Sequence, residues 1–69
     1  MFKYNIDINK EIRWGAPCVK CTRISVFDII NWIENGMSFS EIISDFPELT
    51  ISDINESIRY YQEIIKQKN

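Results

Sequence analysis

The fold of this chain is decided between residues 38 and 53, which read SFSEIISDFPELTISD. The segment contains one short pattern twice, because Ser38 stands three residues before Glu41 and Thr50 stands three residues before Asp53. In this capping box the hydroxyl accepts a hydrogen bond from a free N–H of the first helical turn, and the carboxylate reaches back to the helix start. Each copy therefore predicts the beginning of a helix.

A third capping box lies upstream, where Ser25 precedes Asp28 by three residues. The helix that it opens ends near Gly36, since glycine takes the left-handed C-terminal conformation without strain, and Pro47 ends the second helix. The third helix is the longest, because apolar residues recur every three or four positions almost to the end of the chain. These residues are Ile51, Ile54, Ile58, Tyr61 and Ile65. Residues 25–69 thus predict a mainly α body of three helices with helix-turn-helix geometry.

Residues 1–24 predict an extended arm in front of this body. Residues 3–8 alternate polar with apolar side chains, as a β-strand does. Gly15 and Pro17 indicate a turn, and residues 18–20 and 23–24 suit short extended pieces. We expect a short strand or hairpin whose uncovered edges offer pairing with a second chain.

The length of 69 residues and the apolar content of 45% predict one domain with a thin core. Partner binding or a homodimer would reinforce such a core. The sequence has no His and no glycine-rich phosphate loop, so we expect neither an enzyme nor a cofactor. It also has no signal-peptide core and no apolar stretch of about 20 residues, which predicts a cytoplasmic protein without a membrane segment.

The net charge of −2 is distributed unevenly between the arm and the body. Residues 1–24 carry five cations and two carboxylates, for a net charge of +3, whereas residues 25–69 carry three cations and eight carboxylates, for −5. A basic arm and an acidic body favour different partners on different faces. The alternative is that the two parts attract one another.

Arg23 has two interpretations. It contacts phosphate or an acidic partner together with Arg13 and Lys20, or it binds a carboxylate of the body and holds the arm against the helices. The candidate carboxylates are Asp28, Asp53 and Glu56. The negative charge of the body favours the second interpretation.

The two cysteines, Cys18 and Cys21, have the spacing of a zinc half-site or a redox pair. A zinc site needs four ligands, and the chain has no third Cys and no His, so a metal would require a second subunit. We expect reduced, partly buried cysteines and no metal. Trp14 and Trp32 are expected in the core, with exposed partner anchors as the alternative.

The third helix presents an acidic outer face. Asn55 suits adenine, but its neighbours Asp53 and Glu56 cannot neutralise phosphate, which dominates affinity for DNA. DNA contacts are therefore expected chiefly from the arm, and the acidic face suits a basic protein partner. The predicted DNA-binding residues are Arg13, Lys20, Thr22, Arg23 and Asn55. The predicted partner-binding residues are Glu56, Arg59, Tyr60 and Ile64.

Several motifs occur in order along nearly the whole chain. They are Gly15-Ala16-Pro17, Thr22-Arg23-Ile24-Ser25-Val26, Asn35-Gly36-Met37-Ser38, Asp45-Phe46-Pro47-Glu48-Leu49-Thr50, Asp53-Ile54 and Tyr60. In these motifs the chain resembles the domain-of-unknown-function family 433. The resemblance implies a homeodomain-like helix-turn-helix protein of the VapB antitoxin type, which binds a PIN-like ribonuclease toxin and its own promoter DNA. The alternative is a protein-protein interaction module that has this shape and does not bind DNA.

The chain departs from the family pattern at Cys21, where the pattern has glycine before threonine and arginine. If this position requires a positive φ angle, the cysteine side chain raises the energy of the turn by about 1 kcal/mol or more.

Overall fold

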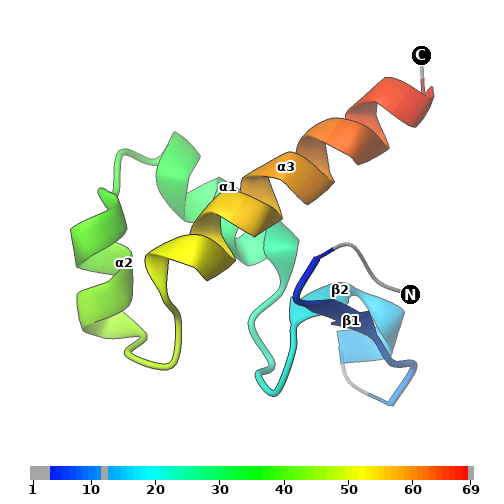
Figure 1. Ribbon diagram of the computed structural model, residues 1–69, viewed down its shortest axis with the longest axis horizontal. Helices are drawn as coiled ribbons and strands as arrows, with labels where there is room; N and C mark the ends of the chain where they lie inside the picture. The colour runs from blue at the N-terminus through cyan, green and yellow to red at the C-terminus, as the bar shows by residue number, and fades with distance from the viewer. Residues whose placement is uncertain (1–3, 12, 69) are drawn as a thin grey trace.

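The computed structural model describes residues 4–11 and 13–68, with side chains up to residue 66. The arm consists of strand β1 (Ile6–Ile8), a 3₁₀ turn η1 (Arg13–Gly15) and strand β2 (Pro17–Val19). Helices α1 (Val26–Glu34), α2 (Phe39–Asp45) and α3 (Ile51–Lys68) follow. Figure 1 shows α1 and α3 crossing in the middle, with the hairpin at the lower right and α2 at the left. The predicted arrangement of a short hairpin and three helices is confirmed.

All three predicted capping boxes are formed. In each one the cap hydroxyl accepts from a backbone N–H of the first turn, and the carboxylate accepts from the backbone N–H of the cap residue. The backbone nitrogen of the cap lies 3.2 Å from the carboxylate in the pair Ser25 and Asp28, 2.8 Å in Ser38 and Glu41, and 3.0 Å in Thr50 and Asp53. These local contacts explain why each helix begins where it does.

The ends of the first two helices also follow the sequence signals. Gly36 has a φ angle of 93°, and the N–H of Met37 donates to the carbonyl of Trp32 over 3.1 Å. This closes α1 with the left-handed geometry that glycine favours. Phe46 caps α2 directly before Pro47, as predicted.

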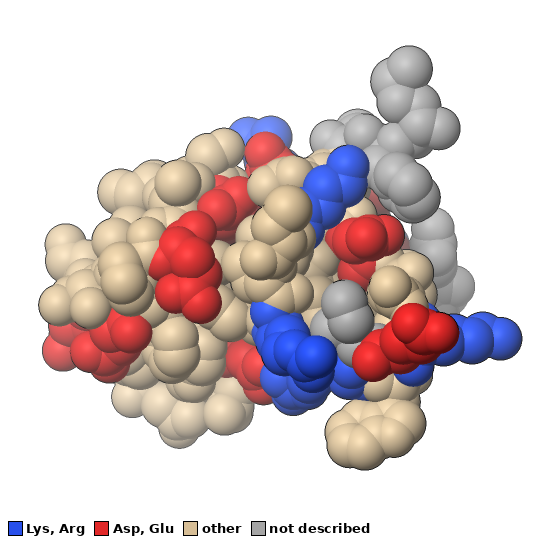
Figure 2. Space-filling view, turned by 90° about the horizontal axis from the view of Figure 1, so that it is seen from below, with Lys and Arg blue, Asp and Glu red and all other residues tan. Residues whose placement is uncertain are grey.

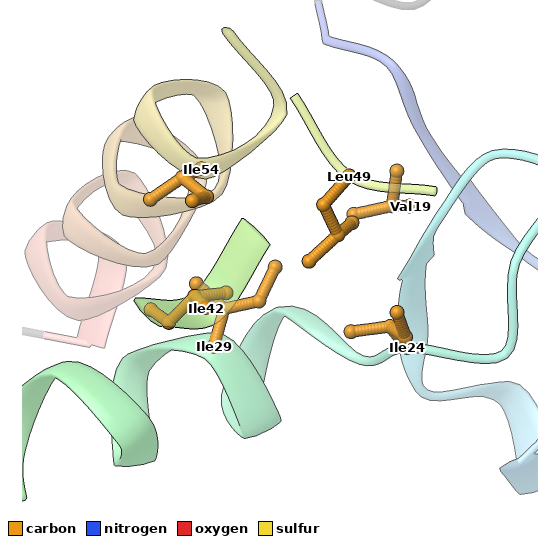
Figure 3. Close-up of a cluster of buried hydrophobic side chains, with 6 residues drawn as sticks. All are labelled: Val19, Ile24, Ile29, Ile42, Leu49 and Ile54. Carbon is orange, nitrogen blue, oxygen red and sulfur yellow. The ribbon is translucent and has the colours of Figure 1, made fainter. Parts of the chain in front are cut away.

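The hydrophobic core joins the arm to all three helices. Figure 3 shows six buried side chains that converge from β2, the segment before α1, the three helices and the turn between α2 and α3. They are Val19, Ile24, Ile29, Ile42, Leu49 and Ile54. Trp32 packs against this cluster and stacks on Phe46 at a centroid distance of 4.3 Å, so its predicted core position is confirmed.

The hairpin is shorter than the alternating pattern of residues 3–8 suggests, and residue 3 lies outside the described residues. β1 pairs antiparallel with β2, with Ile6 opposite Val19. On its other side, β2 forms an isolated bridge from Cys18 to Ser25, so its pairing continues into the start of α1. The arm therefore packs as part of the folded domain.

The segment before β1 is bound to α3. The backbone N–H of Asn5 donates to Glu56 over 2.6 Å, and its side-chain amide donates to Asp53 over 3.2 Å. The hydroxyl of Tyr4 donates to Glu63. Arm and body thus attract one another through hydrogen bonds to the acidic face of α3.

Candidate functional site

The most unusual backbone of the arm is the turn η1. Arg13, Trp14 and Gly15 have successive φ angles of 52°, 56° and 83°, all in the left-handed region. Such angles are rare for residues with a side chain. The Trp14 side chain is 93% exposed, so its predicted position in the core is wrong. The left-handed turn carries the indole outward, away from the cluster that contains Val19 and Ile24.

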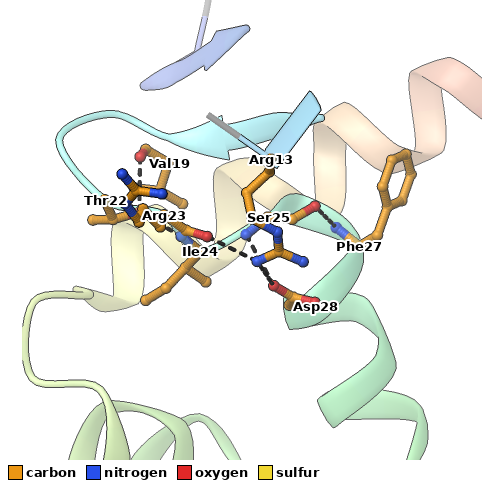
Figure 4. A network of polar contacts seen from close by, with 8 residues as sticks. All are labelled: Arg13, Val19, Thr22, Arg23, Ile24, Ser25, Phe27 and Asp28. Atoms are coloured by element: carbon orange, nitrogen blue, oxygen red, sulfur yellow. Dashed lines mark hydrogen bonds and ion pairs between the residues drawn. The ribbon is translucent and has the colours of Figure 1, made fainter. Parts of the chain in front are cut away.

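Arg13 holds this turn against the start of α1. Its Nη1 donates to the carbonyl of Arg23 and to Oδ2 of Asp28, each over 3.0 Å (Figure 4). The contact expected between the arm and a body carboxylate is therefore made to Asp28, but by Arg13 in place of Arg23. Both side chains are partly exposed, so the ion pair stabilises the fold modestly.

Arg23 is exposed, and its side chain extends toward Thr22, away from Asp28 (Figure 4). Within the described residues its guanidinium forms no ion pair. The expectation that Arg23 binds a carboxylate of the body is therefore wrong, because Arg13 occupies that place. The guanidinium of Arg23 is available to a partner.

Thr22 stabilises the turn that precedes α1. Its hydroxyl donates to the carbonyl of Val19 over 2.8 Å and accepts from the N–H of Ile24 over 3.1 Å. The hydroxyl therefore has a structural role, and its predicted contact with DNA stays a prediction. Lys20 is exposed at the end of the hairpin.

The cysteines lie in different environments. Cys18 is buried, and burial raises the pKa of its thiol. Cys21 is exposed and has a φ angle of 65°, the positive value that the glycine of the family pattern suggests. No group of three or more His, Cys, Asp or Glu side chains able to hold a metal ion occurs in the part of the chain that the structure describes.

The exposed indole of Trp14 borders an open hollow of about 280 Å³. The other side chains that line it are Lys10, Glu11, Arg13 and Arg23. Figure 2 shows Lys and Arg side chains gathering in the half of the view that contains the arm. The hollow therefore combines an aromatic face with three cations and one carboxylate.

The predicted partner-binding face of α3 is largely used by the protein's own arm. Glu56 accepts from Asn5, and Tyr60 packs edge-to-face against Tyr4 at a centroid distance of 6.0 Å. Donation to Glu63 raises the pKa of Tyr4. The other two predicted partner-binding residues differ in exposure, because Arg59 is exposed and Ile64 is half-buried. Asn55, a predicted DNA-binding residue of the same helix, is exposed.

Two exposed carboxylates lie at the turn between α2 and α3, and the site prediction did not include them. Asp45 ends α2, and Glu48 lies in the following turn. Neither forms an ion pair with a described residue. The sequence contains one signal for this turn. Asp45 lies shortly before the predicted helix end at Pro47, and a carboxylate at the C-terminal end of a helix interacts unfavourably with the helix dipole.

None of the helices in the described residues is both long enough and apolar enough to cross a lipid bilayer.

Comparisons with known proteins identify a family and a similar fold. The model of a family described as "Protein of unknown function (DUF433)" matches residues 6–61. No curated protein matches the chain. A crystal structure of a DUF433 member protein from Anabaena variabilis ATCC 29413 is similar, with 25% sequence identity and a TM-score of 0.86. The match covers 94% of this chain and 64% of that one, so this chain spans less than two thirds of its relative's length.

Proposed function

We propose that this chain, which belongs to the DUF433 family of proteins of unknown function, is an antitoxin-like protein that binds a PIN-like ribonuclease toxin. The binding surface in this proposal is the acidic turn between α2 and α3. The observation that carries it is the pair of exposed carboxylates, Asp45 and Glu48, which have no cationic partner within the described residues.

The chemistry of this turn favours a basic protein. A negative charge at the C-terminal end of α2 is unfavourable by about 0.3–1 kcal/mol, and a cationic surface would neutralise it. A ribonuclease that binds the RNA backbone has such a surface, since phosphate neutralisation supplies much of its affinity. Complementary charge would also steer the two proteins together.

The same turn disfavours insertion of α3 into a DNA groove. In a helix-turn-helix protein the first turns of the second helix approach the bases, and the phosphates lie beside them. Here that region carries Asp45, Glu48 and Glu56, all negative. Asn55 is exposed nearby, but a single amide does not offset this repulsion.

A second candidate function is binding of promoter DNA by the arm. It is favoured by the exposed cations Lys10 and Arg23, which form no ion pair within the described residues. A mobility-shift assay with the upstream DNA tests it, because phosphate contacts make affinity fall as salt rises. Stable toxin binding without salt-sensitive DNA binding would identify the chain as a protein-protein module.

Coexpression with the product of an adjacent PIN-like gene tests the main proposal. We expect the two proteins to copurify, and we expect the double variant Asp45→Lys, Glu48→Lys to weaken the complex about tenfold or more. The matched control, Glu11→Lys with Glu34→Lys, changes the net charge equally at exposed positions away from the turn. Failure of the wild-type pair to copurify, or equal weakening by both double variants, would contradict the proposal.

A further inference from the structure

We propose that Trp14 and the cations around it form a contact site for an unpaired nucleotide of a single-stranded nucleic acid. This site lies on the arm and does not require toxin binding at the acidic turn, although Arg23 also lines a second hollow together with Glu48 of that turn. It goes beyond the second candidate function, because it specifies the state of the nucleic acid and names the residue that recognises its base.

The indole is accessible, and the backbone turn that presents it is anchored. Trp14 is 93% exposed, which is unusual for so large an apolar side chain. The turn that presents it is closed by a hydrogen bond of 3.1 Å from the N–H of Ala16 to the carbonyl of Arg13. The guanidinium of Arg13 is in turn bound to Asp28. The aromatic face is therefore presented by a backbone that is anchored to α1.

Lys10 lies next to this turn. A Cβ atom placed on Gly15 would lie 3.9 Å from both Cα and Cγ of Lys10, so the two segments are in van der Waals contact. Gly15 also has a φ angle of 83°, which disfavours any other residue there. The backbone thus brings one cation beside the indole, and Arg23 lines the same hollow from the other end of the arm.

The combination of groups matches a nucleotide. A base offers a flat face that can stack on the indole, and its phosphates can bind Lys10 and Arg23, which form no ion pair within the described residues. Arg13 contributes less, since Asp28 already balances its charge. A base inside a duplex is stacked between its neighbours and its face is covered, so the site fits an unpaired base.

An acidic peptide fits the site less completely. Carboxylates would bind the cations but would leave the indole without a partner. A nucleotide uses both the aromatic face and the positive charge, which is the arrangement found where proteins bind single strands without reading their sequence.

Fluorescence anisotropy with a labelled oligothymidylate of about 12 nucleotides tests the inference on the full chain. We expect salt-sensitive binding that Trp14→Ala weakens about 5- to 100-fold and that Trp14→Phe largely restores. The matched control is Ile51→Ala on α3, which truncates another exposed apolar side chain and should leave affinity unchanged. Because Trp14 is so exposed, its truncation should also leave the thermal unfolding midpoint unchanged.

Three results would overturn the inference. The first is absence of binding to the oligothymidylate. The second is duplex binding as tight as single-strand binding and unaffected by Trp14→Ala, which would leave the arm as a binder of DNA backbone. The third is binding of a labelled oligoglutamate peptide as tight as binding of the oligothymidylate, because a peptide uses the cations and leaves the indole without a partner. Toxin copurification with Trp14→Ala, measured in parallel, keeps the outcome separate from that of the main proposal.

Discussion

At the scale of single residues, Cys21 carries local backbone strain at the position where the chain departs from the family pattern. Its φ angle of 65° lies in the left-handed region, where a side chain costs about 1–2 kcal/mol. The family pattern has glycine at this position, which would relieve the strain. The condition stated from the family pattern, a positive φ angle at this position, is therefore met.

We therefore expect Cys21→Gly to raise the free energy of unfolding by up to about 1 kcal/mol, since part of the relief is offset by the greater freedom of glycine in the unfolded chain. Urea denaturation measures this change. The adjacent Lys20→Gly is the control, because Lys20 has no positive φ angle, and it should destabilise the protein. A loss of stability in Cys21→Gly would contradict the conclusion that the backbone at Cys21 is strained.

Other properties of single residues were beyond the reach of the sequence. Arg13 and Arg23 have the same chemistry and lie on the same basic arm, so charge alone could not decide which one binds Asp28. The left-handed turn at Arg13 decides it, and two of its three residues are not glycine. The same backbone explains why Trp14 lies outside the core. Its outward position follows from the left-handed turn, which the apolar character of the side chain does not reveal.

At the scale of elements, the helix starts could be predicted because capping boxes are local. Each box places donor and acceptor within four residues, so its geometry depends little on the rest of the fold. The hairpin could be predicted only in outline, because its register depends on contacts with Ser25 and with α3 that are distant in the sequence. Asp45 and Glu48 are not among the residues that the sequence predicts to bind a partner, because in the sequence they stand out only as part of a family motif.

The box at the start of α2 offers a direct test at this scale. We expect Ser38→Ala to lower the free energy of unfolding by about 1 kcal/mol, because the N–H of Glu41 loses its acceptor. Ser40 lies exposed in the same first turn, and Ser40→Ala should be neutral or slightly stabilising. Equal effects of the two substitutions in thermal melts would show that the cap contributes nothing.

At the scale of the whole molecule, the arm is bound to the acidic body at two places, by the ion pair between Arg13 and Asp28 at α1 and by hydrogen bonds to α3. Glu56 accepts from the backbone of Asn5, and Asp53 accepts from its side chain. The acidic face of α3 thus has a structural partner within the chain, whereas Asp45 and Glu48 at the turn between α2 and α3 form no ion pair with a described residue.

Substitution of Glu56 tests this assignment. We expect Glu56→Ala to destabilise the isolated protein by about 1 kcal/mol, because the N–H of Asn5 loses its partner. The neighbouring Asn55→Ala, at an exposed position of the same helix, should change stability by less than about 0.5 kcal/mol. Urea denaturation compares the two variants. Unchanged stability in Glu56→Ala would mean that the hydrogen bond between Asn5 and Glu56 does not stabilise the protein.

The bonds between the arm and α3 also have a consequence for synthesis on the ribosome. Asn5 and its acceptors are separated by 48 and 51 residues, so the segment before β1 cannot dock until α3 has been made. At about 5–20 residues per second, synthesis of the residues between them takes about 2–10 seconds. During that time the segment before β1 lacks its acceptors on α3, so its docking is a late step in the folding of this domain.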